Sequence, residues 1–271
     1  MGVIRYLKRH DNAYLRAGLV ITLSLLLLVI LSRLLSGGDV NAMDASSKNL
    51  GISLSHPMGT DKFGRDIFGR VMYGTRVSLL IAAGTVAIGT LAGIAVGAFA
   101  GYFGGLLDTL ISRVIDALFA FPSILLALVF VSLLGTGTWQ LVLSLGIAFV
   151  PSFARIVRAE YLRASSRDYV AAARLQGASH LRVMFVHILP NVKSVLLSSV
   201  MIGFNNAVLA EAGLSFLGIG TKPPFDSLGQ MLSDARGQIL SRPLLVLGPG
   251  ITIILLVLGF SLIGEGLRKQ V

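Results

Sequence analysis

The sequence predicts an all-α protein embedded in a membrane, a polytopic chain with one transmembrane domain of six helices. Two observations lead to this fold class. Of the 271 residues, 54% are hydrophobic and only 13% are charged, whereas an ordinary soluble domain carries about 25% charged residues. Long stretches of the chain also hold no charge, as expected for helices that cross lipid. The composition excludes an ordinary water-soluble enzyme and a disordered chain.

Uncharged runs define the spans. The run 117–154 would be ~57 Å long as one helix. This is too long for a single crossing, and a Gly-Thr-Gly-Thr segment followed by Trp139 divides it. We therefore predict six spans, at about 15–35, 77–101, 114–134, 139–157, 194–213 and 243–264. Residues 1–14 form a predicted cytoplasmic segment. Residues 15–271 form a single transmembrane domain with a cytoplasmic loop at 158–193.

The positions of the basic residues predict the orientation. Six spans place both termini on one side, and with that side inside, fourteen of the 23 lysines and arginines lie there. Inner loops of membrane proteins carry such an excess. Most of the net charge of +10 then reflects topology, so nucleic-acid binding is not expected. The first span lacks a small-x-small cleavage site after it and is predicted to be an uncleaved anchor.

A row of glycines marks the second span. Glycine recurs at every fourth position, at residues 89, 93, 97, 101 and 105. Without side chains on this face, another helix can approach closely, as is common for helices in lipid. The pattern predicts helix packing, either within the chain or against a partner.

The segment 155–193 is the largest charged part of the interior of the sequence. Asp168 is a candidate N-cap for a short helix that ends at Gly177, and Ser179 a candidate N-cap for a second helix that stops before Pro190. Two interpretations remain open from the residues alone. The pair is either an internal hairpin that covers the ends of the spans, or an element that docks into a groove of a cytoplasmic partner.

This segment resembles the EAA loop of permease subunits of bacterial ABC importers. The resemblance rests on Ala172-Ala173-x-x-x-Gly177 and on Leu189-Pro190. In that family the loop forms a coupling helix that sits in a cleft of the ATPase subunit. Here Ala171 stands where the family usually has an acidic residue. The resemblance implies that the ATPase-coupling residues are Ala171, Ala172, Ala173, Gly177, Ala178, Leu189 and Pro190.

Two further motifs narrow the resemblance. Residues 56–66 (HPMGTDKFGRD) and 211–220 (EAGLSFLGIG) resemble segments of dipeptide, oligopeptide and nickel permeases, in particular the second, C-type subunit. The resemblance covers residues 55–269. It implies the transmembrane fold of a type I ABC importer in a bacterial inner (plasma) membrane.

The first of these motifs predicts a short amphipathic helix at the outer interface. Asp61, Arg65, Asp66, Arg70 and Arg76 alternate in sign at helical spacing, with Gly64 among them, and Phe63, Ile67 and Val71 can form an apolar face. Such a helix either supports docking of an extracellular binding protein or braces the bundle through local ion pairs.

Polar residues at membrane depth are candidates for the translocation path. These are Asn205, Asn206 and Glu211, because polar groups in lipid are costly and often functional. Helix-to-helix hydrogen bonding is the alternative for the two asparagines. Asp116 is a further candidate, and pairing with Arg113, one helical turn earlier, is the alternative for it.

The motifs that are missing exclude several chemistries. The chain has no Gly-x-x-x-x-Gly-Lys-Ser/Thr phosphate loop and no cysteine, and its four histidines lack metal-ligand spacing. We therefore expect no catalytic residues, no metal and no cofactor. ATP hydrolysis is expected on separate chains.

Together these observations predict a permease subunit of an ATP-driven importer of peptides, nickel or metal chelates. The resemblance implies four kinds of partner: a homologous second permease, two ATPase subunits, a solute-binding protein and membrane lipid. A nickel or opine-metal importer is the alternative within the family. An ATPase-independent channel or carrier, or a membrane-embedded enzyme, is the alternative outside it.

Overall fold

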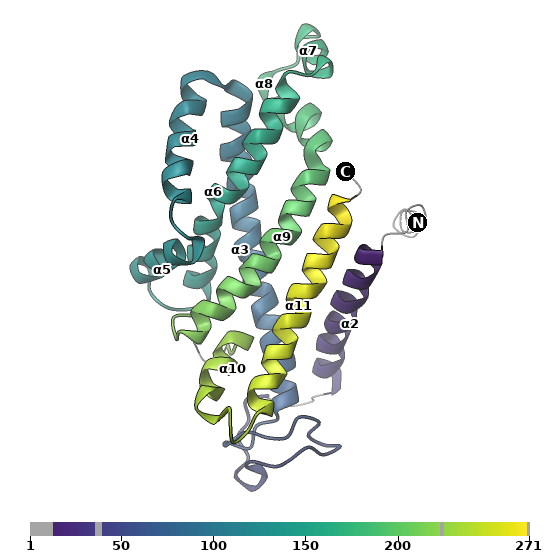
Figure 1. Ribbon diagram of the computed structural model, residues 1–271, viewed down its shortest axis with the longest axis vertical. Coiled ribbons are helices and arrows are strands. Elements are labelled where there is room, and N and C mark those ends of the chain that lie inside the picture. Colours follow the sequence, from purple (N-terminus) through teal and green to yellow (C-terminus); the bar gives the residue numbers. More distant parts are fainter. Residues whose placement is uncertain (1–12, 36–39, 223–224, 270–271) are drawn as a thin grey trace.

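The computed structural model describes residues 13–35, 40–222 and 225–269, and within them the chain is helical (Figure 1). The predicted cytoplasmic segment 1–14 falls almost wholly outside these residues. The helices are α2 (Ala13–Leu35), α3 (Ile67–Phe103), α4 (Gly105–Phe119), α5 (Ser123–Leu134), α6 (Thr138–Ser165), α7 (Asp168–Leu175), α8 (His180–Arg182), α9 (Leu189–Phe216), α10 (Leu228–Ala235) and α11 (Leu244–Arg268). A π-helical turn, Val183–Ile188, joins α8 to α9.

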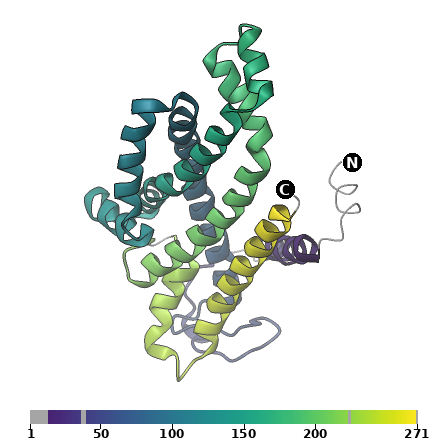
Figure 2. The same ribbon diagram turned by 45° about the horizontal axis from the view of Figure 1, so that its top comes forward.

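Within the described residues, five helical segments are long and apolar enough to cross a membrane, or up to six if α4 and α5 together form one span. The predicted all-α membrane fold is therefore confirmed. The hairpin of α7 and α8 lies at one end of the bundle, and the loop 40–66 and α10 lie at the other (Figure 1). Helix α2 begins, and α11 ends, toward the hairpin end (Figure 1). Figure 2 shows that α2 and α11 lie on the side of the bundle away from α4 and α5.

The residues of the predicted span 114–134 are divided between two helices. These residues belong to α4 and α5, which are bent by 90° relative to each other. The bend lies at Pro122, which precedes the first residue of α5. Proline has no backbone N–H and disfavours helical geometry in the residue before it, so a helix usually ends there. The lack of charge from residue 117 onward concealed this break.

The glycine row of α3 packs against α6 in the same chain. A Cβ atom at Gly97 would clash with the carbonyl oxygen of Ala154, and one at Gly101 would lie 2.5 Å from the carbonyl oxygen of Arg158. Gly93 similarly approaches Phe153. The two backbones therefore touch, and helix packing within the chain explains the spacing over most of its length.

Buried side chains form two separate cores. The main core is built chiefly from α3, α6, α9, α10 and α11. A second core, which we call the hairpin-end core, joins the ends of α3 and α6 to α7, to the π-helical turn and to the start of α9. Its buried members are Ala98, Tyr102, Val157, Tyr161, Ala164, Val170, Ala173, Val183, Met184, Ile188, Val192 and Leu196.

Gly97→Ala is expected to destabilise the protein by about 1–3 kcal/mol, because the added methyl group overpacks a backbone contact. The matched control is Gly250→Ala in α11, where a Cβ atom would meet nothing within 4 Å. Thermal unfolding of the purified chain in detergent measures both. Equal stability of the two variants would show that the close approach of α3 and α6 is dispensable.

Candidate functional sites: an exposed hairpin, a membrane groove and an outer ion network

The α7–α8 hairpin turns at Gly177. The N–H groups of Gly177 and Ala178 donate to the carbonyl oxygens of Arg174 (3.0 Å) and Ala173 (3.1 Å). This is a Schellman motif, which needs a left-handed residue after the helix. Gly177 has φ +77°, a conformation that favours glycine. The spacing from Ala173 to Gly177 in the sequence is therefore the one that the Schellman motif requires between these two residues.

Two details of the predicted hairpin are wrong. Asp168 is the first residue of α7 and not its N-cap, which is Arg167. The second helix does not stop before Pro190. It passes through the π-helical turn, where the N–H of Leu189 donates to the carbonyl of Met184, and continues as α9. The wider turn accommodates a proline that cannot donate a hydrogen bond.

The predicted coupling residues do not share one environment. Ala171, Ala172, Gly177 and Pro190 are exposed, Ala178 and Leu189 are half-buried, and Ala173 is buried in the hairpin-end core. Leu175 at the tip of α7 is 90% exposed and was not singled out from the sequence. An apolar residue just before the glycine that ends a helix is the sequence feature that could have indicated it.

A groove of about 390 Å³ lies between α5, α6 and α9. Its polar lining residues are Ser123, Ser152, Ser199 and Asn206, and the rest of the lining is apolar or glycine. None of the described residues that line it is ionisable. Sequence analysis selected Asn206 but missed the three serines, because single serines in apolar helices carry no distinctive pattern.

Asn205 and Glu211 do not line this groove. Asn205 is half-buried, and its side-chain oxygen has no hydrogen-bond partner among the described residues. Glu211 is fully buried.

Glu211 instead joins three helices. Its carboxylate accepts hydrogen bonds from the hydroxyls of Ser78 in α3 (2.8 Å) and Ser215 in α9 (2.7 Å). The Ser78 hydroxyl in turn accepts from the N–H of Leu228, the first residue of α10 (3.2 Å). A buried carboxylate that is hydrogen-bonded on both oxygens holds its neighbours in a fixed arrangement.

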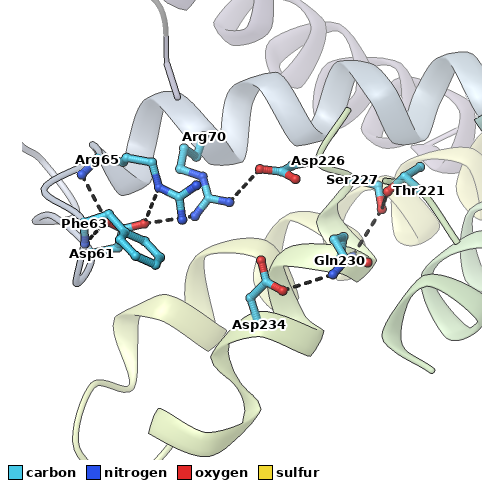
Figure 3. Close-up of polar contacts among 9 residues, drawn as sticks. All are labelled: Asp61, Phe63, Arg65, Arg70, Thr221, Asp226, Ser227, Gln230 and Asp234. Atoms are coloured by element: carbon cyan, nitrogen blue, oxygen red, sulfur yellow. Dashed lines mark hydrogen bonds and ion pairs between the residues drawn. The ribbon is translucent and has the colours of Figure 1, made fainter. Parts of the chain in front are cut away.

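An ion network lies at the end of the molecule away from the α7–α8 hairpin (Figure 1). Figure 3 shows its contacts. Arg70 in α3 donates to Asp61 (3.2 Å) and to Asp226 (2.7 Å), and Arg65 donates to Asp61 (2.7 Å). The Arg70 side chain is 7% exposed. The network links the loop before α3 to the segment before α10, which are far apart in the sequence.

The predicted amphipathic helix is present only from Ile67 onward, as the first turns of α3, and its N-terminal part over Asp61–Asp66 is wrong. These residues form turns, in which the N–H groups of Phe63 and Arg65 donate to the Asp61 carboxylate. Gly64 has φ +80°, and a Cβ there would clash with the carbonyl of Asp44. Asp66 caps α3 by accepting from the N–H of Gly69 at 2.7 Å. The charged residues therefore have helical spacing in the sequence, but in the structure their side chains converge around a turn.

The outer network forms part of the wall of a hollow of about 480 Å³. Apolar side chains that include Met43, Phe63 and Leu245 complete the wall. The Lys62 ammonium and the Arg65 guanidinium both lie over the Phe63 ring, at 5.0 and 4.9 Å from its centroid.

Asp116 pairs with Arg155 of α6 at 2.7 Å and not with Arg113. Asp108 of α4 likewise pairs with Arg158 of α6. The polar face of α4 therefore turns toward α6. The ion pairs between the two helices form in place of a pair within α4. In the described part of the chain, no group of three or more His, Cys, Asp or Glu residues could hold a metal ion.

Comparison with known proteins identifies the family. Residues 93–271 match the family described as binding-protein-dependent transport system inner membrane component. The dipeptide transport system permease protein DppC of Alkalihalophilus pseudofirmus is 41% identical over 264 residues, which cover 97% of this chain and 86% of the relative. The glutathione transport system permease protein GsiD of Pectobacterium atrosepticum is 37% identical over 264 residues, which cover 97% of this chain and 87% of the relative.

A solved structure shares the fold. The inward-facing MetNI methionine ABC transporter matches with a TM-score of 0.62 at 19% identity, over 73% of this chain and 94% of the matched chain. The sequence and the fold agree: this chain belongs to the family of inner-membrane permeases of binding-protein-dependent ABC importers, in which it is a transport subunit and not the ATPase.

Proposed function

We propose that this chain forms half of the translocation pathway of a peptide importer and that its α7–α8 hairpin receives the ATPase. The placement of three features carries the proposal. An exposed, glycine-capped hairpin lies at one end, a braced outer surface lies at the other, and a neutral polar groove lies between them.

The exposed side of α7 suits insertion into a cleft. Ala171 and Ala172 present only methyl groups, and Leu175 projects at the tip. A short helix with small side chains and one apolar anchor can enter a groove deeply. Ala173 and Val170 hold the opposite face of α7 against the chain's own core. A force on α7 therefore reaches the transmembrane helices.

The positions of the basic residues support an orientation of the chain in the membrane. The segment from Arg155 to Lys193 holds seven of them, and cytoplasmic segments of membrane proteins are enriched in lysine and arginine. The hairpin end then faces the cytoplasm, together with the start of α2 and the end of α11. The loop 40–66 and α10 then face outward.

The groove supports a peptide as substrate. Hydroxyl and amide groups on otherwise apolar walls can hydrogen-bond a peptide backbone. Nickel would need a cluster of nitrogen, sulfur or carboxylate ligands, and the described lining offers none. The relatives named above are called dipeptide and glutathione permeases, which points the same way.

The family supports the partners that we propose. A second, homologous permease subunit completes the pathway, so the two chains form a heterodimer. Two ATPase subunits bind at the hairpin end, and a solute-binding protein docks on the outer end. Closure of the ATPases on ATP switches the pair between inward- and outward-facing states.

Gly177→Leu is expected to abolish uptake while the chain still inserts into the membrane. Leucine strains the left-handed backbone at φ +77° and so misplaces α7. Gly177→Asn is the control, because asparagine tolerates this conformation. Both variants are assayed in the whole transporter for uptake and for co-purified ATPase. Normal ATP-driven uptake by Gly177→Leu would contradict the coupling role of the hairpin.

Asn206→Leu is expected to lower dipeptide uptake about five-fold, which corresponds to the loss of about 1 kcal/mol of hydrogen bonding to the solute. Asn205→Leu is the matched control, because the neighbouring asparagine lies outside the groove. Uptake of labelled dipeptide into proteoliposomes measures the difference. If both substitutions have the same effect, the groove is not the peptide path.

We further propose that the outer motif braces the bundle. Arg70→Met leaves the buried carboxylate of Asp226 without its cation and leaves Asp61 with Arg65 alone, and we expect it to cost about 3–5 kcal/mol. Arg155→Met, which removes the exposed pair with Asp116, is expected to cost below about 1 kcal/mol. Thermal unfolding in detergent compares them, and similar losses would refute the brace.

A further inference from the structure

Two tyrosines fasten the hairpin to the transmembrane helices. Tyr102 is the second-last residue of α3, and Tyr161 lies in the last turns of α6. They are 7% and 0% exposed. Both belong to the hairpin-end core, and each carries a hydroxyl into an otherwise apolar environment, where an unpaired polar group is costly.

Tyr102 makes two contacts, one on each side of the Gly177 turn. Its hydroxyl lies 2.9 Å from Nδ1 of His180, the first residue of α8. The guanidinium of Arg174, in the last turn of α7, lies over the Tyr102 ring at 4.9 Å from its centroid. A single side chain from α3 therefore holds both arms of the hairpin. Nδ1 of His180 donates or accepts according to the tautomer of the ring, and the tyrosine hydroxyl can take the complementary role.

Tyr161 holds the next segment. Its hydroxyl donates to the carbonyl of Met184 at 3.0 Å, inside the π-helical turn. The same carbonyl accepts the N–H of Leu189. A side chain from α6 therefore holds the π-helical turn, which is an irregular segment between the hairpin and α9.

The two tyrosines come from helices whose backbones are in contact. Gly93, Gly97 and Gly101 place the backbone of α3 against α6 just before these residues. The hairpin is therefore attached at two points to one rigid helix pair.

We propose that Tyr102 and Tyr161 are positioning residues that make the hairpin and the α3–α6 pair move as one body, so that ATPase closure shifts α6 at the groove. This inference rests on the proposed function of the hairpin. Without the two hydroxyls, motion of α7 would be absorbed by the Gly177 turn and by the π-helical turn. ATP would still be hydrolysed, but fewer solute molecules would cross for each ATP.

The first experiment compares Tyr102→Phe, Tyr161→Phe and the double variant in the whole transporter, reconstituted with its partner chains. We expect the ratio of peptide transported to ATP hydrolysed to fall about five-fold for each single variant, as for the loss of one hydrogen bond, and further for the double variant. Co-purified ATPase should stay at the wild-type level. Tyr14→Phe is the control, because Tyr14 lies in α2 beside Lys269 and outside this core. His180→Asn should retain most of the coupling, because its side-chain amide still offers Tyr102 a partner.

The second experiment replaces the Tyr102 contact with a covalent one. The chain has no cysteine, so Tyr102→Cys with Arg174→Cys creates the only thiol pair. When reduced, this variant should be uncoupled. A short thiol-reactive cross-linker should restore the ratio of transport to hydrolysis.

The outcomes separate this inference from the proposed function. An unchanged ratio in the double phenylalanine variant, or loss of transport on cross-linking, would overturn the positioning role, because the hairpin would then need to move relative to α3. If the ATPase does not depend on α7 for binding, the proposed function of the hairpin fails instead.

Discussion

The backbone contact between α3 and α6 is the constraint on which the rest of the structure depends. It exists because the side of α3 that faces α6 carries glycine at Gly93, Gly97 and Gly101, which lets the two backbones approach closely. Dispersion contacts between the backbones then hold the helices together, since lipid offers no hydrophobic driving force for helix association. Helix α3 spans 37 residues, or ~55 Å. One continuous helix therefore carries Arg70, which belongs to the outer network, Ser78, which binds Glu211, and Tyr102, which contacts the hairpin.

Polar groups in this molecule lie where helices must be held in register. Glu211 ties α3, α9 and α10 together, and Arg70 ties α3 to segments on either side of it in the sequence. A buried carboxylate or guanidinium tolerates little displacement, because loss of its partner leaves a desolvated charge. The outer half of the bundle is therefore stiff.

Sequence analysis reached the fold class and the family because hydropathy and short motifs are local properties. It also located the hairpin, since a Schellman cap needs Gly177 at a fixed distance after Ala173. It failed where tertiary contacts outweighed local spacing. Charges around Asp61 have helical spacing but converge on a turn, Asp116 pairs with Arg155 across two helices, and the bend at Pro122 was concealed by uniform hydropathy.

The groove residues show a second limit of sequence analysis. Asn206 stands out as an amide in lipid, whereas Ser123, Ser152 and Ser199 become a set only when α5, α6 and α9 meet. Glu211 was the more conspicuous candidate for the path, yet it is buried for structural reasons. Charge at membrane depth therefore indicates that a group is important without indicating whether it serves packing or passage.

The groove lies at the boundary between the two cores. Along α9, Leu196 belongs to the hairpin-end core and Ala207 to the main core, and the groove residues Ser199, Ile202, Gly203 and Asn206 fall between them. Along α6, the boundary falls between Phe153 and Val157 in the same way. Phe149, Phe153 and Ala210 line the groove and also belong to the main core, so one wall of the groove is part of the packed interior. Because close-packed cores resist deformation, the path that we propose can change shape only when α6 and α9 move as whole helices.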